Sequence, residues 1–307
     1  MNLIYPVLAV TAGIFLSIQG PVNTALGRRT DKFQATLISF LGGTLLLTVI
    51  VLARGTNGFS HLVEARFWQL LGGLYGALGV CVSVAAIPVL GVALTLTVSM
   101  LGQLVMGTVI DRLGLFETAV TAVSPLRTLG ILTVAAGILL IYAGSRERGQ
   151  QKREKTGMLP MLLLTFCSGL AGAVQSPTNA SLAALIGSWE GTLVSFAVGL
   201  LAIGIVTLAR SRGRLKPMRG VGIRPWMLIG GAYGVAAIFL NLVSVTGLGA
   251  ALQVACGMAG QLAGGIAVDS FGLFQAARVK INLRRAAGVA VILLGVVLIT
   301  LARQQTQ

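Results

Sequence analysis

The sequence predicts an all-α membrane protein with ten transmembrane helices, arranged as two inverted five-helix repeats. Three observations support this prediction. Windows of about 20 residues without Asp, Glu, Lys or Arg recur along the chain, the two halves align with each other, and the basic residues gather in every second loop. Only 10% of the 307 residues are charged, and the mean hydropathy is +0.90. Since a soluble domain carries about 25% charged residues, this chain has too few to cover a water-facing surface.

The apolar runs are continuous rather than alternating, which favours helices over barrel strands. A helix of about 20 residues crosses a hydrocarbon core about 30 Å thick. The predicted spans are residues 3–26, 33–53, 67–88, 91–110, 127–144, 158–183, 191–209, 225–245, 248–268 and 285–302. The chain therefore divides into a first repeat over residues 1–145, a basic linker over 146–157 and a second repeat over 158–307.

The sequences of the two halves indicate an internal duplication. Residues 12–54 align without a gap on residues 168–210, with 14 of 43 positions identical, and residues 68–116 align on 226–274, with 19 of 49 identical. The identities include Gln, Pro, Asn, Trp, Tyr and Asp, which chance agreement between apolar helices rarely supplies. Because five spans per half is an odd number, the second half enters the membrane from the opposite side, as in inverted-repeat transporters.

The distribution of basic residues predicts the orientation. If the N-terminus lies outside, the cytoplasmic loops are residues 27–32, 145–157, 210–224 and 270–285, and they hold 18 of the 23 Lys and Arg residues. Cytoplasmic loops of membrane proteins are enriched in Lys and Arg. We therefore expect a multi-pass membrane protein with both termini outside.

A Gln-x-Pro-x-Asn motif falls inside the first span of each half. Proline removes a backbone donor and clashes with the carbonyl four residues earlier, so we expect a helix break, by kinking or local unwinding, at each proline. The neighbouring amides can repair the break, hold adjacent helices together or bind a substrate between the repeats. The candidate binding residues are Gln19, Asn23, Gln175 and Asn179, and the candidate helix breaks are Pro21 and Pro177.

A second polar motif lies on the fourth span of each half. Residues four apart share one helix face, and Gln103 falls about 18 Å into its helix, close to the bilayer midplane. An amide at this depth faces either a partner helix or a cavity. The candidate binding residues on these spans are Ser99, Gln103, Gln253 and Gln261.

Each fourth span ends at an aspartate, Asp111 or Asp269. We expect these carboxylates to pair with Arg112, Arg127 or loop residues near the interface, with proton carrying or gating as the alternative. The spacing Gly-xxx-Gly at 72–76 recurs at 230–234 and predicts close helix packing.

The chain lacks the residues that most catalytic sites need. No Asp, Glu, Lys or Arg lies deep inside a predicted span, the only histidine is His61 in a polar loop, and the three cysteines have no metal-ligand spacing. The P-loop, HExxH, GxSxG and CxxC motifs are absent from the sequence. We therefore expect neither an enzyme, nor a metal site, nor a cofactor, and the basic loops are not a nucleic-acid interface.

On the paired elements QGPVN and QSPTN, WQLLGGLYG and WMLIGGAYG, and GQLVMGTVIDRLGLF and GQLAGGIAVDSFGLF, the sequence resembles the drug/metabolite transporter (EamA-like) superfamily. More closely, it is similar to the YdcZ-like inner-membrane family, as a fused two-repeat member. The resemblance implies an inner-membrane transporter. Relatives in the small multidrug resistance branch bind cations through a glutamate in the first helix, where this chain has Gln19.

The sequence therefore predicts a secondary transporter or exporter of a small polar metabolite, neutral or zwitterionic, that works by alternating access between antiparallel repeats. Its partners would be the solute and membrane lipid. A monomer is expected because the fusion supplies both halves, and a homodimer is the alternative. The other function that fits the sequence is a non-transporting scaffold or lipid-interacting protein, which would have a dry interior.

Overall fold

The computed structural model describes residues 3–55, 58–117, 120, 124–146, 157–212, 215, 222–279 and 282–304. The long helices are α1 (Ile4–Arg29), α2 (Lys32–Arg54), α4 (Gly72–Leu90), α5 (Val92–Leu113), α6 (Pro125–Arg146), α7 (Met158–Ile186), α8 (Ser188–Ser211), α9 (Gly230–Phe271) and α10 (Leu283–Gln304). The short elements are α3 (Phe67–Leu70) and 3₁₀ turns at Gly58–Glu64, Leu115–Glu117, Pro225–Met227 and Leu273–Gln275. Every regular element in these residues is helical, which confirms the predicted all-α class.

Within the described ranges, nine helices are long and apolar enough to cross a bilayer, and a shorter apolar helical stretch covers Gly230–Ser244. One of the nine joins α3 and α4 over Phe67–Leu90. This layout is compatible with the ten predicted spans. The eighth span begins at Gly230 rather than at residue 225, because Pro225–Met227 form a 3₁₀ turn ahead of it.

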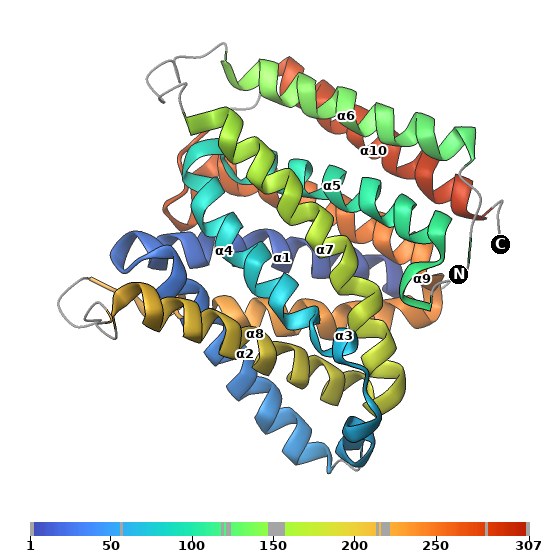
Figure 1. Cartoon of the computed structure of the whole chain (residues 1–307). Helices are drawn as coiled ribbons and strands as arrows, with labels where there is room; N and C mark the ends of the chain where they lie inside the picture. Colours follow the sequence, from blue (N-terminus) through green and yellow to red (C-terminus); the bar gives the residue numbers. More distant parts are fainter. Residues whose placement is uncertain are drawn as a thin grey trace.

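Helix α9 contains two predicted spans and doubles back on itself. The Nε2 of Gln253 donates a hydrogen bond to Oδ1 of Asn241 at 2.5 Å, although residues 12 apart in a straight helix are separated by about 18 Å. The chain therefore reverses direction between Asn241 and Gln253, and Figure 1 shows the two orange legs meeting at the right of the view, near the α9 label.

Equivalent helices of the two halves run in opposite directions. In Figure 1 this holds for α1 and α7, for α2 and α8, and for α6 and α10. Helices α1, α6 and α8 end at the left of the view, where α2, α7 and α10 begin, and both chain termini lie at the right. The helix ends that flank the predicted cytoplasmic loops thus share one end of the bundle. Which end faces the cytoplasm stays a prediction.

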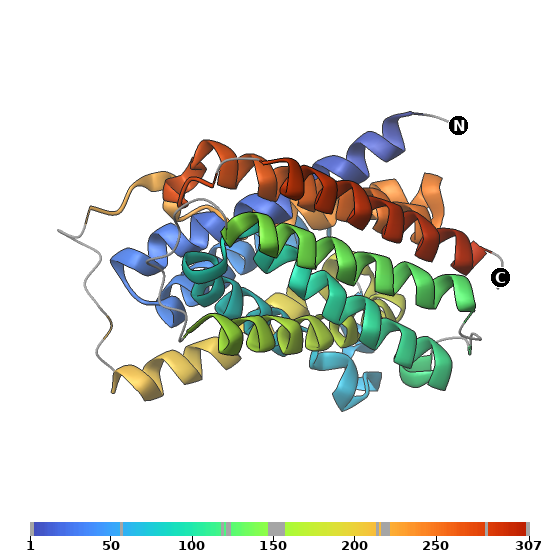
Figure 2. The same cartoon turned by 90° about the horizontal axis from the view of Figure 1, so that it is seen from above.

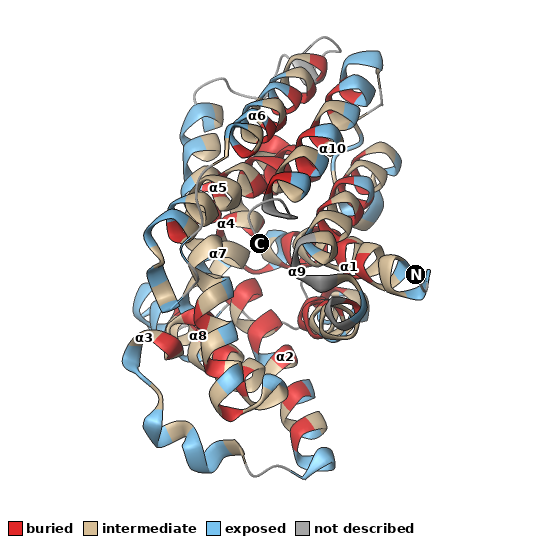
Figure 3. Cartoon of the chain, turned by 90° about the vertical axis from the view of Figure 1, so that its right-hand side faces the viewer, coloured by how far each residue is buried: buried red, intermediate tan, exposed pale blue. Residues whose placement is uncertain are grey.

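The bundle has apolar outer faces. Leu45, Val49 and Leu52, which recur at helical spacing on α2, are all exposed, and Figure 3 shows the buried residues where helices face each other. A contiguous apolar surface of this kind would be a liability in water. It suits contact with lipid tails.

Helices α6 and α10 pack against each other along one side of the molecule, as Figure 2 shows from above. Their contact depends on glycine, because a Cβ atom at Gly137 would lie 2.7 Å from the carbonyl oxygen of Gly288, and one at Gly130 would lie 2.9 Å from that of Gly295. Small residues at such points let two backbones approach closely.

Of the two forms of helix break expected at the prolines, local unwinding is not found, and kinking stays a prediction. Pro21 lies inside the continuous helix α1 and Pro177 inside the continuous helix α7. Each proline removes a single backbone hydrogen bond, and a transmembrane helix packed among neighbours tolerates that loss. The amides beside the prolines are therefore presented from helical backbone.

Candidate functional site

The Gln-x-Pro-x-Asn motif of the first half packs on the Gly-xxx-Gly motif of the second half. A Cβ atom at Gly230 would overlap the amide of Asn23, and one at Gly234 would lie 2.9 Å from the amide nitrogen of Gln19. The two polar side chains of α1 thus lie on the glycine face of α9. Two motifs that the sequence presents separately form one interface.

The same interface recurs with the halves exchanged. A Cβ atom at Gly72 would overlap the amide of Asn179, and one at Gly76 would lie 2.6 Å from the amide nitrogen of Gln175. Here α7 of the second half packs on α4 of the first. Each first helix is therefore held by the opposite half, so the two halves interlock.

Several amide atoms in these interfaces have no hydrogen-bond partner among the described residues. Asn23 is 1% exposed, and both its Oδ1 and its Nδ2 are unpaired, as is Oδ1 of Asn179. A buried polar group without a partner costs about 1–3 kcal/mol. Such groups are rare in folded proteins, and a bound ligand or an ordered water commonly accounts for them.

Helices α1, α2, α4, α5, α7, α8 and α9 line a partly open cavity of about 460 Å³, within the range of about 300–1,000 Å³ that is usual for small-molecule sites. We call it the central cavity. Its polar lining residues are Ser17, Gln19, Asn23, Tyr75, Ser83, Ser99, Gln103, Ser168, Gln175, Asn179, Ser188, Thr192 and Ser195. Among the described residues, none that line it is Asp, Glu, Lys, Arg or His. Its polarity therefore comes from amides and hydroxyls.

A second cavity of about 680 Å³, which we call the side chamber, adjoins the first. The two share the lining residues Gln103, Gly172, Ala180, Ile238 and Leu242. The side chamber also contains the only ion pair found along either lining in the described part of the chain, between Arg127 Nη2 and Asp111 Oδ2 at 2.8 Å.

Gln103 lies at the boundary of the two cavities. Among the described residues, its one hydrogen bond to a side chain, from Nε2 to Ser99 Oγ, is long at 3.4 Å, so the amide is only weakly engaged. The matched residue of the second half, Gln261, lies outside the lining of both cavities, and its backbone packs against Gly13 of α1.

The structure thus brings seven of the eight candidate residues to the cavities. Gln19, Asn23, Ser99, Gln175 and Asn179 line the central cavity, Gln253 lines the side chamber, and Gln103 lines both.

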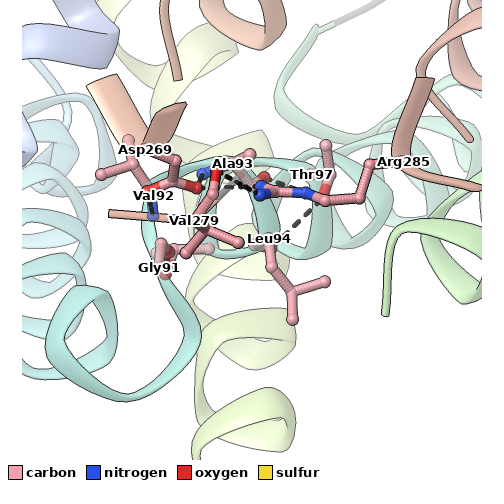
Figure 4. Close-up of polar contacts among 9 residues, drawn as sticks. Gly91, Val92, Ala93, Leu94, Thr97, Asp269, Val279 and Arg285 are labelled. Atoms are coloured by element: carbon pink, nitrogen blue, oxygen red, sulfur yellow. Dashed lines mark hydrogen bonds and ion pairs between the residues drawn. The ribbon is translucent and has the colours of Figure 1, made fainter. Parts of the chain in front are cut away.

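The two aspartates form equivalent ion pairs at opposite ends of the bundle. Asp111 pairs with Arg127, as the sequence suggested, and Asp269 pairs with Arg285 through Nη2 and Oδ2 at 3.2 Å. Asp269 also accepts hydrogen bonds from the backbone N–H groups of Val92 at 2.8 Å and Ala93 at 3.0 Å, at the start of α5. Figure 4 shows Arg285 and these backbone groups converging on the carboxylate.

Sequence reasoning missed part of the lining. Tyr75 lines the central cavity and belongs to the repeated motif around Gly72, which was interpreted as packing only. The matched residue of the second half is also a tyrosine, Tyr233, and this identity was an available signal. Asn241 lines the side chamber, and the matched residue of the first half is Ser83, so no identity marked it.

An interlocked helical bundle with an amide-rich hollow at its centre is the architecture of a membrane transport protein. Residues 4–140 and 160–298 match the family described as "Putative inner membrane exporter, YdcZ". The chain belongs to this family, and the two matched segments correspond to its two halves.

Two further proteins are similar to this chain. Over 108 residues, 33% of this chain, it is 32% identical to "Inner membrane protein YdcZ" of Escherichia coli (strain K12), of which that match covers 70%. A solved structure described only as "Crystal structure of protein" aligns with a TM-score of 0.62 and 18% identity over 99% of each chain. The latter likeness concerns the fold alone.

Proposed function

We propose that the protein is a secondary transporter that exports a small polar metabolite through the central cavity. The observation that carries the proposal is the position of this cavity: amides from the first helix of each half enter it beside the glycine face of the other half. A site between repeats of opposite direction is where alternating access places a substrate.

The lining points to a neutral or zwitterionic solute. A solute with a net charge would lose its hydration on entry, and the described lining of the central cavity offers no ionised side chain to replace it. A polar solute without net charge would instead exchange water for hydrogen bonds to Gln19, Asn23, Gln103, Gln175 or Asn179. The unpaired amide of Asn23 supplies both a donor and an acceptor.

Alternating access would follow from exchange of conformation between the halves. If the termini lie outside, as the basic loops predict, the Asp111 end faces outward and the Asp269 end faces the cytoplasm. The side chamber would then connect the central cavity to the outer side.

A non-transporting scaffold or lipid-interacting protein is the competing function. It requires a close-packed interior in which the glutamines of the fourth spans bond only to helices. The position of Gln103 between two cavities, with a single long bond to Ser99, favours transport over this alternative.

Flux in proteoliposomes across a panel of neutral and zwitterionic metabolites tests the proposal. We expect the intact protein to move at least one solute, Gln103→Ala to reduce that flux by about tenfold through the loss of one hydrogen bond, and Gln261→Ala to retain it. Gln261 is the matched control, since it is the equivalent residue and lies outside both cavities. Equal flux in the two variants would contradict the proposed binding site. The absence of both flux and a ligand-induced thermal shift for every solute would contradict the proposed transport function.

A further inference from the structure

The side chamber presents one pair of opposite charges to its interior. Asp111 lies in the last turn of α5 and Arg127 in the first turn of α6, and they meet through Oδ2 and Nη2 at 2.8 Å. Their side chains are 18% and 10% exposed, and both line the chamber. No other residue in the described lining is Asp, Glu, Lys, Arg or His. A solute in the chamber would therefore meet its only charges at this pair.

The equivalent pair of the second half lies in different surroundings. Asp269 lies 158 positions after Asp111, and Arg285 lies the same distance after Arg127. The carboxylate of Asp269 is 2% exposed and accepts hydrogen bonds from Arg285 and from the first two N–H groups of α5. Both residues belong to the described part of the chain, and neither lines a cavity. That pair holds helices together, whereas Asp111 and Arg127 border a hollow.

An ion pair on a cavity wall can exchange partners with a solute that carries both charges. A carboxylate of the solute would accept hydrogen bonds from Arg127, and an ammonium group would donate to Asp111. The exchange forms two contacts between opposite charges in place of one, and it adds no net charge to the chamber. A solute with a single charge would instead leave one side chain of the pair without its counter-charge, which is costly away from water.

The guanidinium of Arg127 has a donor to offer. It carries five N–H donors in all, and its Nε is buried without an acceptor among the described residues. A buried donor without an acceptor is costly. Rotation of the guanidinium onto a carboxylate in the chamber would engage two of its nitrogens together, in the bidentate geometry that arginine favours.

The rest of the chamber suits an apolar side group. Ile110, Met258 and Val296 line it, and they are 3%, 7% and 6% exposed. Its volume of about 680 Å³ is within the usual range for small-molecule sites. The chamber therefore combines a charged position for the head of a solute with an apolar wall for its side group.

From this arrangement, and resting on the proposed function, we propose that the side chamber is a second binding site, for a zwitterionic solute with an apolar side group. The carboxylate of the solute binds Arg127, its ammonium group binds Asp111, and its side group lies on the apolar wall. Gln103, which lines both cavities, lies where the solute passes to the central cavity. The ion pair thus selects zwitterions over cations and anions before or after that passage.

Protection of a thiol in the chamber tests this site without transport. In a background with Cys81, Cys167 and Cys256 replaced by Ala, Thr300→Cys places a reporter on the chamber lining. The rate at which a maleimide labels this reporter in detergent-purified protein measures how far the chamber is occupied. The probes are L-leucine and the two compounds that lack one of its charged groups, the cation isopentylamine and the anion isocaproate.

We expect L-leucine to slow the labelling, and each analogue to need a concentration about tenfold higher for the same effect, because it lacks one charged contact. Glycine, which has both charges but no side group, should also bind about tenfold more weakly than leucine or worse.

Neutralising one member of the pair should change the preferred probe. Asp111→Asn leaves Arg127 without its counter-charge, so isocaproate should protect the thiol about tenfold better than leucine. Arg127→Gln leaves Asp111 alone, so isopentylamine should become the best of the three. A pair that served only to hold helices together would not produce this change of preference. Gln261→Ala, outside both cavities, is the control and should keep the preference for leucine.

Protection by leucine that is no stronger than protection by its analogues would overturn the site, and so would an unchanged preference in either single variant. If a single variant aggregates, the double variant Asp111→Asn/Arg127→Gln, which leaves no unpaired charge, decides. A tenfold loss of leucine affinity there supports the site, and an unchanged affinity overturns it.

The labelling also separates this site from the transport function. Because it needs no flux, the expected pattern of protection without flux of any metabolite would support the second site and contradict transport. Flux without the pattern would support transport and contradict the second site.

Discussion

The side-chain amide of Asn23 occupies the space that a Cβ atom on Gly230 would fill. The first helix of one half can therefore approach the other half only where glycine leaves room. The same relation between Asn179 and Gly72 means that the interlock is formed twice. Glycine at these positions is a requirement of the interface between the halves rather than of either helix.

The first prediction follows from this contact. Gly230→Ala should lower the free energy of unfolding by about 1–3 kcal/mol, the usual cost of overpacking a tight contact. Gly107→Ala is the control, because a Cβ atom there meets nothing within 4 Å, and alanine is favoured over glycine inside a helix by about 1 kcal/mol. Thermal unfolding in detergent measures both. Equal stability of the two variants would show that α1 and α9 can separate without cost.

Much of this fold was predictable because the hydropathy pattern and the internal duplication are both visible in the order of residues along the chain. Spans such as 33–53 and 158–183 lie within α2 and α7, and the predicted pairing of Asp111 with Arg127 is confirmed. The facing of Asn23 and Gly230 was not predictable, since periodicity defines a helix face but does not identify the partner of that face.

The different surroundings of equivalent residues in the two halves could not be predicted from the sequence either. Gln103 and Gln261 are equivalent by alignment, yet only Gln103 reaches the cavities. Asp111 and Asp269 likewise differ only in what surrounds them. In one conformation of the protein, equivalent residues of the two similar halves have different surroundings. The sequence of either repeat does not indicate which surroundings its residues will have.

A second prediction separates binding from stability at Asn23. Asn23→Leu, a change to an apolar side chain of similar shape, should leave the unfolding temperature unchanged or raised, because the two buried amide atoms have no hydrogen bond to lose within the described part of the chain. The flux of a transported solute should fall by roughly tenfold. Calorimetry and proteoliposome flux measure the two effects. A strongly destabilised variant would instead show that the amide holds the bundle together.

The third prediction compares a buried ion pair with an exposed one. Arg285→Met leaves the carboxylate of Asp269 buried without its counter-charge, which typically costs about 3–5 kcal/mol. Arg66→Met breaks the pair with Glu117, whose side chain is 54% exposed, and exposed pairs contribute about 0–1 kcal/mol. Chemical denaturation in detergent should therefore rank Arg285→Met well below Arg66→Met. Similar losses in the two variants would mean that the backbone bonds from α5 suffice to hold Asp269.

The last prediction concerns the opposed orientation of the halves, on which the proposed alternating access depends. Val63 and Leu215 are exposed residues in the connections that precede the third span of each half. In a cysteine-free background, an impermeant maleimide should label Val63→Cys on intact cells and should label Leu215→Cys only after permeabilisation. The basic residues flanking Leu215 favour its cytoplasmic placement. Labelling of both positions from one side would place equivalent connections in a single compartment. Two halves of equal orientation could not exchange conformations to open alternate faces, so alternating access would be excluded.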